Sequence, residues 1–142
     1  MTIEELGADD YERIVDLWDR AGMKAKLKGR DTPSNIRKQI ASGTVIILGD
    51  FQRGCLRGVV IVSSDGRKGW INRLAVLPEF REQGIASSLV HEAERRLKKM
   101  GIEIFAAHIE EENSSSKELF EKLGYVPARD IIYYVKRLRD DF

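Results

Sequence analysis

The segment from residue 70 to residue 109 constrains the fold more than any other part of this sequence. A β-branched, apolar run at 70–76 leads through a glycine-containing turn into a helical pattern with an apolar residue at every fourth position. These apolar positions are Ile85, Leu89, Ala93 and Leu97. After Gly101, which suits the end of a helix, residues 102–109 are again mostly apolar. A strand, a crossover helix and a return strand in one sheet are parallel neighbours with a right-handed connection, so we predict a βαβ unit.

The rest of the sequence predicts three more helices and several strands. Apolar residues at three- and four-residue spacing predict a helix over about 9–21. Thr32 before Pro33 predicts the N-cap and first turn of a short helix that ends near Ser42, and another short helix is expected at 113–123. The strands predicted outside the βαβ unit are 2–6, 45–48, 59–62 and 131–138.

Together these elements predict one α/β domain that spans residues 1–142. Turn sequences at 52–54 and 65–68 join the strands between residues 45 and 76 into two hairpins, so most of the sheet is expected to be antiparallel. We therefore predict a mixed, mostly antiparallel central sheet of about six to seven strands, with about four helices packed against it.

Charge and cysteine content exclude several kinds of function. The 24 Lys and Arg residues nearly balance the 23 Asp and Glu residues, so the net charge of +1 gives no support for nucleic-acid binding. No apolar run approaches the roughly 20 residues of a membrane-spanning helix, and the first residues lack the features of a secretory signal, so we expect a cytoplasmic protein without a membrane partner. The lone Cys55 and the distant His91 and His108 supply neither an internal disulfide nor a recognisable zinc site, so we expect no metal.

The turn before residue 85 has the features of a main-chain anion site. It reads Arg81-Glu82-Gln83-Gly84-Ile85-Ala86. Gly84 has no Cβ, so the chain can turn tightly there and let a ligand approach N–H groups that the following helix cannot satisfy internally. A helix N-terminus of this kind favours phosphate. The segment lacks the Gly-Lys-Ser/Thr ending of a P-loop and the three spaced glycines of a dinucleotide fingerprint, so neither of those designs fits.

Two motifs together resemble the GCN5-related N-acetyltransferase (GNAT) family. The first is the segment 81–86 after the strand-like Leu74-Ala75-Val76, which is similar to the family pattern Arg/Gln-x-x-Gly-x-Gly/Ala. The second is Asn113 followed by Leu-Phe-Glu-Lys-Leu-Gly-Tyr at 119–125, which is similar to the family's Asn upstream of Leu-Tyr-Glu-Lys-Leu-Gly-Phe. The order of the predicted elements also matches, so the resemblance covers nearly the whole chain and is weakest at 22–42.

The resemblance implies acetyl-coenzyme A as the acyl donor. Main-chain N–H groups of residues 83–87 would hold its pyrophosphate, and the backbone of Leu74 and Val76 would pair with the pantetheine arm. The Val76 N–H would polarise the thioester carbonyl. The residues that the resemblance places at this cofactor are Leu74, Ala75, Val76, Arg81, Glu82, Gln83, Gly84, Ile85, Ala86, Ser87, Asn113 and Phe120. Capping of the short helix is the alternative role for Asn113 and for Ser115.

The two motifs leave the proton-transferring groups open. The family's usual acid is the Tyr of the second motif, where this chain has Phe120; either Phe120 packs in the core and water protonates the thiolate, or a nearby Tyr substitutes. The relatives' base lies two or four residues before the Leu-Ala-Val segment, where this chain has Asn72 and Trp70, and Asn72 can orient a water without accepting a proton. The catalytic candidates are therefore Asn72, His108, Tyr125 and Tyr133, with Tyr134 as the neighbour that alternates faces with Tyr133.

The acceptor side carries one further sequence feature. The basic residues Lys24, Lys26, Lys28 and Arg30 stand where the family places a variable loop over its substrate. Three interpretations stay open: contact with an acidic acceptor, contact with the nucleotide phosphate, or a solvated loop.

We therefore expect an N-acetyltransferase that transfers acetyl from acetyl-coenzyme A to a primary amine by direct attack in a ternary complex. The acceptor is a small-molecule or peptide amine, and a homodimer is compatible with the sequence. Cys55 matches no nucleophile motif, so a covalent acyl-enzyme is not expected. The alternatives are a non-catalytic acyl-coenzyme A-binding sensor and a structural or interaction domain, because a fold does not settle function.

Overall fold

The computed structural model describes residues 2–23 and 29–139, and a sheet lies at its centre. Among these residues the sheet has five strands in the order β1-β2-β3-β4-β5. They are β1 (Thr2–Leu6), β2 (Val45–Gln52), β3 (Cys55–Ser64), β4 (Gly69–Val76) and β5 (Phe105–Ala106). All neighbouring pairs are antiparallel except β4 and β5, which are parallel as the βαβ prediction requires. The predicted mixed, mostly antiparallel α/β fold is confirmed.

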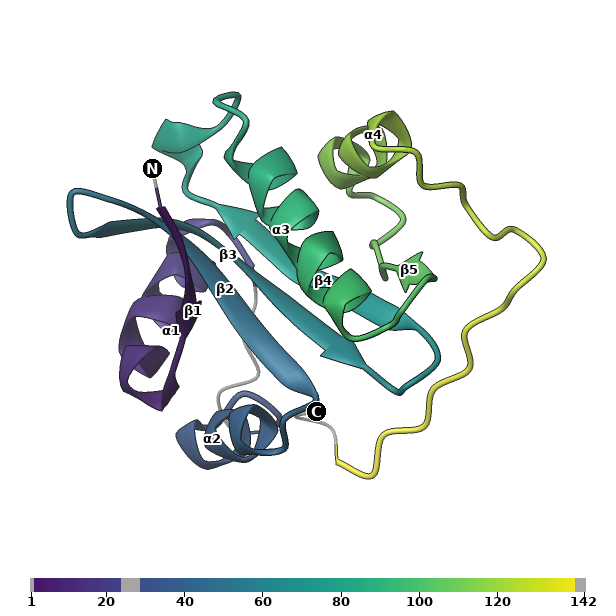
Figure 1. Ribbon diagram of the computed structural model, residues 1–142, viewed down its shortest axis with the longest axis horizontal. Coiled ribbons are helices and arrows are strands. Elements are labelled where there is room, and N and C mark those ends of the chain that lie inside the picture. Colours follow the sequence, from purple (N-terminus) through teal and green to yellow (C-terminus); the bar gives the residue numbers. More distant parts are fainter. Residues whose placement is uncertain (1, 24–28, 140–142) are drawn as a thin grey trace.

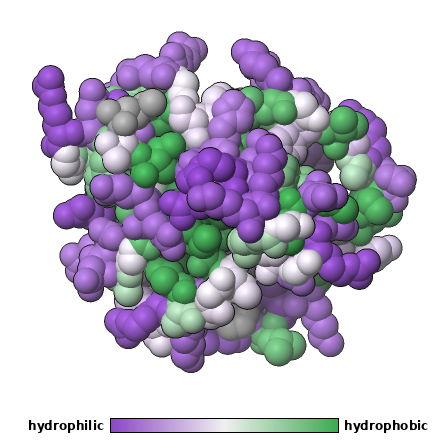
Figure 2. Space-filling model, viewed as in Figure 1, coloured by the Kyte–Doolittle hydropathy of each residue, from purple (hydrophilic) through white to green (hydrophobic). Residues whose placement is uncertain are grey.

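Helices cover the sheet (Figure 1). They are α1 (Tyr11–Arg20), α2 (Pro33–Ala41), α3 (Ile85–Lys99) and α4 (Ser114–Lys122), with the 3-10 helices η1 (Ala8–Asp10) and η2 (Pro78–Phe80). Thr32 caps α2 as predicted, because its side chain accepts a hydrogen bond from the Asn35 N–H at 3.2 Å. The face that α3 presents in Figure 2 is largely hydrophilic, with smaller hydrophobic areas between the charged side chains.

Two clusters of buried side chains pack on opposite faces of the sheet. α3 packs Leu89 and its neighbours on strand residues such as Val60, and Phe120 of α4 joins this cluster. α1 and α2 pack Trp18 and their other apolar residues on strand residues such as Val59. Adjacent strand residues enter different clusters because successive side chains of a strand point to opposite faces. Both faces of the central strands are buried, which explains their nearly continuous apolar sequence.

A β-bulge interrupts the pairing of β3 with β4. Val59 pairs with Ala75 and Ile61 pairs with Asn72, so two residues of β4 stand opposite Val60. One of these two, Arg73, has a φ of 55°, which is in the left-handed region. A bulge bends its strand and redirects the side chains beside it.

Two of the predicted strands differ from the structure. The return strand predicted at 102–109 is limited to β5, because beyond Ala106 the His108 N–H donates to the Asn72 side chain, at 2.9 Å, rather than to the main chain of β4. Residues 131–138 do not form the predicted last strand, because no described strand pairs with them and their apolar side chains are exposed. The sheet of the described residues therefore has five strands rather than six to seven.

Candidate functional site

The turn at residues 81–84 gives α3 an N-terminus formed by main-chain groups alone. Gly84 is the N-cap residue, with φ 81° and ψ 7°, and no side chain of the described residues caps this end of the helix. Glu82 is also left-handed, with φ 64°. A Cβ on Gly84 would meet no protein atom within 4 Å, so it is the backbone conformation, not crowding, that favours glycine there. The first N–H groups of α3 lack helical partners and carry the positive end of the helix dipole, so they suit an anion.

Arginine side chains connect this turn and the segment before it to neighbouring elements. Arg81 donates from Nε to the Val76 carbonyl at 3.1 Å and from Nη2 to the Ala21 carbonyl at 3.2 Å. Its guanidinium therefore ties the end of β4 to the end of α1. Before the turn, the Arg57 guanidinium lies 5.4 Å from the ring centre of Phe80 and donates from Nε to the buried Asp50 carboxylate at 2.8 Å. These contacts hold the segment that leads into the anion turn.

The two parallel strands separate beside this turn. β4 and β5 pair only at Gly69 with Phe105 and at Trp70 with Ala106. Further along β4, its other edge stays paired with β3 as far as Val76. No described strand pairs with the β5-facing edge of residues 74–76. Apart from the Val76 carbonyl, which already accepts from Arg81, the main-chain groups of this edge can pair with an extended ligand.

A surface hollow lies between the first turn of α3 and α4. Its volume is about 470 Å³. Its lining residues are Ser87, Ser115, Glu118, Leu119, Glu121 and Lys122. These two helices lie side by side in Figure 1, and Ser87 in the first turn of α3 lines the hollow together with residues of α4.

The residues of the second motif have structural contacts. The Asn113 side chain caps α4, because its Oδ1 accepts a hydrogen bond from the Ser116 N–H at 3.1 Å. Phe120 is buried in the cluster under α3 and packs edge-on against Tyr125, with ring centres 5.0 Å apart. These contacts match the capping and packing alternatives, and they leave a ligand contact of Asn113 as a prediction.

Three of the four catalytic candidates gather where β4 and β5 separate. The Asn72 side chain accepts a hydrogen bond from the main-chain N–H of His108. The centre of the His108 ring lies 4.5 Å from the ring centre of Trp70 and 4.9 Å from that of Tyr133. Ile71 packs in the α3 cluster, so its neighbours Trp70 and Asn72 point to the opposite face of the sheet. The ring stack is thus placed away from the α3 face.

The fourth candidate, Tyr125, lies elsewhere. Its hydroxyl donates to the Glu94 carboxylate of α3 at 2.6 Å. Burial, followed by the hydrogen bond and charge of Glu94, raises the pKa of Tyr125 well above its ordinary value. The structure therefore separates Tyr125 from the Asn72, His108 and Tyr133 group.

Sequence motifs did not mark the polar pair of Asp31 and Arg73. The Arg73 Nη1 atom donates to both carboxylate oxygens of Asp31, at 3.0 and 2.8 Å. The only signal in the sequence is a charged residue inside the apolar run 70–76. Of the basic stretch, Lys24, Lys26 and Lys28 lie outside the described residues.

The described residues contain neither a membrane-spanning helix nor a cluster of metal ligands. No described helix has the length and apolar character needed to cross a membrane. No group of three or more His, Cys, Asp or Glu side chains in the described ranges is arranged to hold a metal ion.

Comparison with solved structures identifies this architecture as an N-acetyltransferase fold. PaiA N-acetyltransferase from Thermoplasma acidophilum, in complex with coenzyme A, is similar with a TM-score of 0.77 at 22% identity, over 87% of this chain and 89% of that one. An aminoglycoside antibiotic 6'-N-acetyltransferase from Acinetobacter haemolyticus has a TM-score of 0.79 at 18% identity, over 98% and 100%. Ribosomal-protein-alanine N-acetyltransferase from Brucella melitensis biovar Abortus 2308 has a TM-score of 0.75 at 18% identity, over 97% and 100%.

The family follows from the sequence match. The model of the acetyltransferase (GNAT) family matches residues 11–125. The chain therefore belongs to the GNAT family, as its two motifs predicted.

Proposed function

We propose that this protein transfers an acetyl group from acetyl-coenzyme A directly to a primary amine. The observation that carries the proposal is the main-chain anion turn at Gly84, which lies beside the unpaired edge of β4. A pyrophosphate and an extended amide-containing arm are the two ligand parts that these groups suit, and coenzyme A contains both. Membership of the GNAT family supports the same donor.

The donor would be held mainly by the backbone. In the proposal, the N–H groups of residues 83–87 bind the pyrophosphate, and residues 74–76 pair with the pantetheine arm. Acetyl-coenzyme A supplies a thioester, whose carbonyl carbon is open to an amine nucleophile. The Val76 N–H stabilises the negative charge that grows on the carbonyl oxygen during transfer.

The acceptor amine would approach from the face that carries the ring stack. Its nitrogen forms a bond to the carbonyl carbon, and the bond from that carbon to sulfur breaks. We assign the proton of the amine to His108, directly or through a water that Asn72 orients, because a neutral imidazole can accept a proton and His108 lies beside Asn72. The thiolate takes a proton from Tyr133 or from water. Tyr125 has no assigned role, because its hydroxyl donates a hydrogen bond to Glu94 and lies apart from the other candidates.

The acceptors that fit this weakly basic site best are amines of low pKa. An α-amine with a pKa of about 7.7 costs roughly 1 kcal/mol to deprotonate at pH 7, whereas a lysine amine near 10.4 costs roughly 4.6 kcal/mol. We therefore propose a peptide α-amine or a small molecule with a similar amine. Equal transfer rates to α-amino and lysine acceptors at matched concentration would refute this preference.

The donor site is tested by adding one methyl group at Gly84. The control is Gly66→Ala, because Gly66 has a similar φ of 87°, and a Cβ there also meets nothing within 4 Å. Both alanines strain a left-handed residue by about 1–2 kcal/mol, so both variants should lose similar stability. Gly84→Ala alone should also weaken coenzyme A binding by about tenfold, which is about 1.4 kcal/mol by calorimetry. Equal affinities in the two variants would argue against the anion turn as the donor site.

Catalysis is tested by thiol release from acetyl-coenzyme A with a panel of amines. Release that rises with amine concentration supports the transferase. A coenzyme A-binding sensor is the second candidate, and it is favoured by the buried Phe120 in place of the family's tyrosine acid. Tight coenzyme A binding without amine-dependent release would select the sensor.

We also propose that the chain forms a homodimer. The supporting observation is the run of exposed apolar side chains at residues 131–138, such as Ile132 and Tyr134. Light scattering after size exclusion should give twice the mass of 16.2 kDa. A monomer mass across micromolar concentrations would contradict this part of the proposal.

A further inference from the structure

Arg73 occupies a conformation that an arginine rarely adopts. Its φ of 55° falls inside strand β4, at the bulge opposite Val60. Left-handed residues other than glycine persist where their surroundings hold them, and they cluster at functional sites. The contacts of the Arg73 side chain therefore decide what holds the bulge.

Those contacts join three elements. The guanidinium donates to both oxygens of the buried Asp31 carboxylate and lies 4.1 Å from the ring centre of the fully buried Trp18 of α1. The Tyr11 hydroxyl of α1 donates to the Asp31 carbonyl. Arg73 Nη1 bridges both carboxylate oxygens, and both side chains are largely buried, so this pair is more narrowly fixed than an exposed ion pair.

Asp31 belongs to a short segment that is itself closed onto α2. The Asn35 side chain donates to the Gly29 carbonyl at 2.7 Å, and the Asn35 N–H donates to Thr32 Oγ1 at 3.2 Å. Residues 29–32 and the first turn of α2 therefore form one unit. The pair of Asp31 and Arg73 sets the position of this unit against β4.

The unit lies on the side of the sheet that the amine must use. The anion turn and the hollow are on the α3 and α4 side, so the pyrophosphate of the donor would lie on that side. Arg73 contacts α1 on the other side, and its neighbour Asn72 in β4 holds His108. The chain at 29–32 is thereby fixed next to the strand that carries Asn72.

We propose that the Asp31–Arg73 pair is a positioning device for the amine acceptor, and this inference rests on the proposed transfer reaction. The pair holds residues 29–32 as a wall of the acceptor site beside Asn72. It also holds the bulge that directs Asn72 toward His108. In this proposal neither residue touches the reacting atoms, and the pyrophosphate is held by the turn at Gly84 rather than by the pair.

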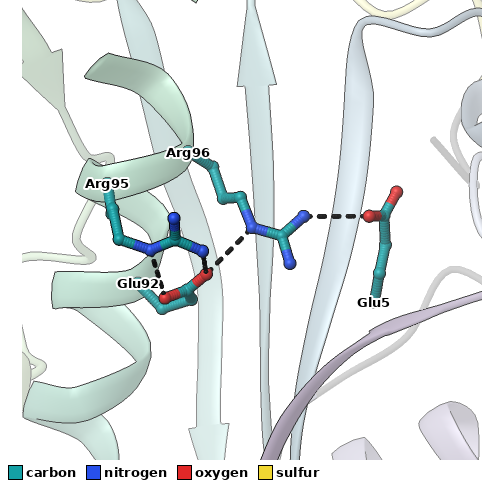
Figure 3. Close-up of polar contacts among 4 residues, drawn as sticks. All are labelled: Glu5, Glu92, Arg95 and Arg96. Carbon is teal, nitrogen blue, oxygen red and sulfur yellow. Dashed lines mark hydrogen bonds and ion pairs between the residues drawn. The ribbon is translucent and has the colours of Figure 1, made fainter. Parts of the chain in front are cut away.

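The test compares three variants of the full chain. Asp31→Asn keeps the shape and removes the charge, Arg73→Gly keeps the left-handed backbone and removes the guanidinium, and Arg73→Lys keeps the charge without the fork. Glu5→Gln is the matched control, because Glu5 accepts from Arg96 at 2.9 Å and also joins a strand to a distant helix (Figure 3).

The measured quantities are the KM for the best amine of the panel and the Kd for coenzyme A. We expect Asp31→Asn and Arg73→Gly to raise the amine KM about tenfold or more while the coenzyme A Kd stays within about twofold. Arg73→Lys should recover part of the loss, and Glu5→Gln should match the wild type in both quantities. If the pair had only a structural role, the amine KM and the coenzyme A Kd would either both rise or both stay unchanged.

The contradicting results are distinct. A wild-type amine KM in folded Asp31→Asn and Arg73→Gly overturns the inference and leaves the transferase intact. A parallel rise of the coenzyme A Kd overturns it as well. If Arg73→Gly fails to fold, Asp31→Asn and Arg73→Lys decide the question. Wild-type protein that binds coenzyme A and releases no thiol with any amine overturns the proposed function, and this inference with it.

Discussion

Strands β2 to β4 and the chain after β5 have similarly apolar sequences but different surroundings. Leu48 and Val60 in the central strands are fully buried, because these strands have a neighbouring strand along each edge and helices over each face. Ile132 is 73% exposed and Tyr134 is 87% exposed. β-branched and aromatic residues form a strand where packing rewards them, so the same residue types give a ladder in one region and an irregular chain in the other.

The largest expected contrast comes from shortening an apolar side chain in each region. Leu89→Ala removes a fully buried side chain from the α3 cluster and should lower the free energy of unfolding by about 2–5 kcal/mol. Ile132→Ala should change it by less than about 0.5 kcal/mol, because its side chain is exposed. Urea unfolding of dilute protein measures both. A large loss for Ile132→Ala would show that the 131–138 segment packs in solution.

A smaller effect is expected at the hydrogen bond that joins the chain after β5 to α3. Tyr125→Phe removes the hydroxyl that donates to Glu94 and should cost about 1 kcal/mol. Tyr134→Phe is the control, because Tyr134 is exposed and should tolerate the change. Thermal unfolding of both variants makes the comparison, and equal melting temperatures would mean that the chain after α4 is not anchored through Tyr125.

The smallest effect concerns the charge cluster on α3. The hydrogen bond from Arg95, reinforced by Arg96, lowers the pKa of Glu92 to about 2 from an ordinary value of 4.5 (Figure 3). A carboxyl group whose pKa is lower in the folded protein stabilises the fold when the pH is above its pKa in the unfolded chain. The contribution of Glu92 is therefore complete above pH 4.5 and is lost as the pH falls toward 2. Solvent screens the charges of this cluster, so we expect Glu92 to contribute up to about 1 kcal/mol to the free energy of unfolding.

Unfolding measured between pH 6 and 2.5 tests this contribution. Glu92→Gln should flatten the acid limb of the stability curve relative to the wild type. Ser115→Ala is the control, because Ser115 is exposed and carries no titrating group. An acid limb that is unchanged in Glu92→Gln would assign the acid sensitivity to other carboxylates.

Local signals predicted most of the fold. The helix caps and apolar spacing marked α1 to α4 within a few residues, and the hairpin turns marked β2 to β4. The strand predicted at 131–138 failed because its own residues favour a strand while the partner that a strand requires is a property of the whole fold. The return strand was shortened for a similar reason, since Asn72 replaces the main chain of β4 as the partner of His108.

In the candidate site, too, the sequence predicted the part formed by adjacent residues and missed the part formed by distant residues. The anion turn follows from Gly84 and the helix after it, which are adjacent in the sequence. The pair of Asp31 and Arg73 joins residues 42 positions apart, and neither residue belongs to a motif. Roles for His108, Tyr133 and Asn113 in catalysis or binding stay predictions, although the structure gives each of them a defined neighbour.

The ring stack has an optical consequence. The chain has two tryptophans, and Trp70 lies on His108 while Trp18 lies under Arg73. Both indoles therefore border the side of the sheet away from α3. Their fluorescence is a built-in reporter, because an amine that enters on that side of the sheet should change the emission.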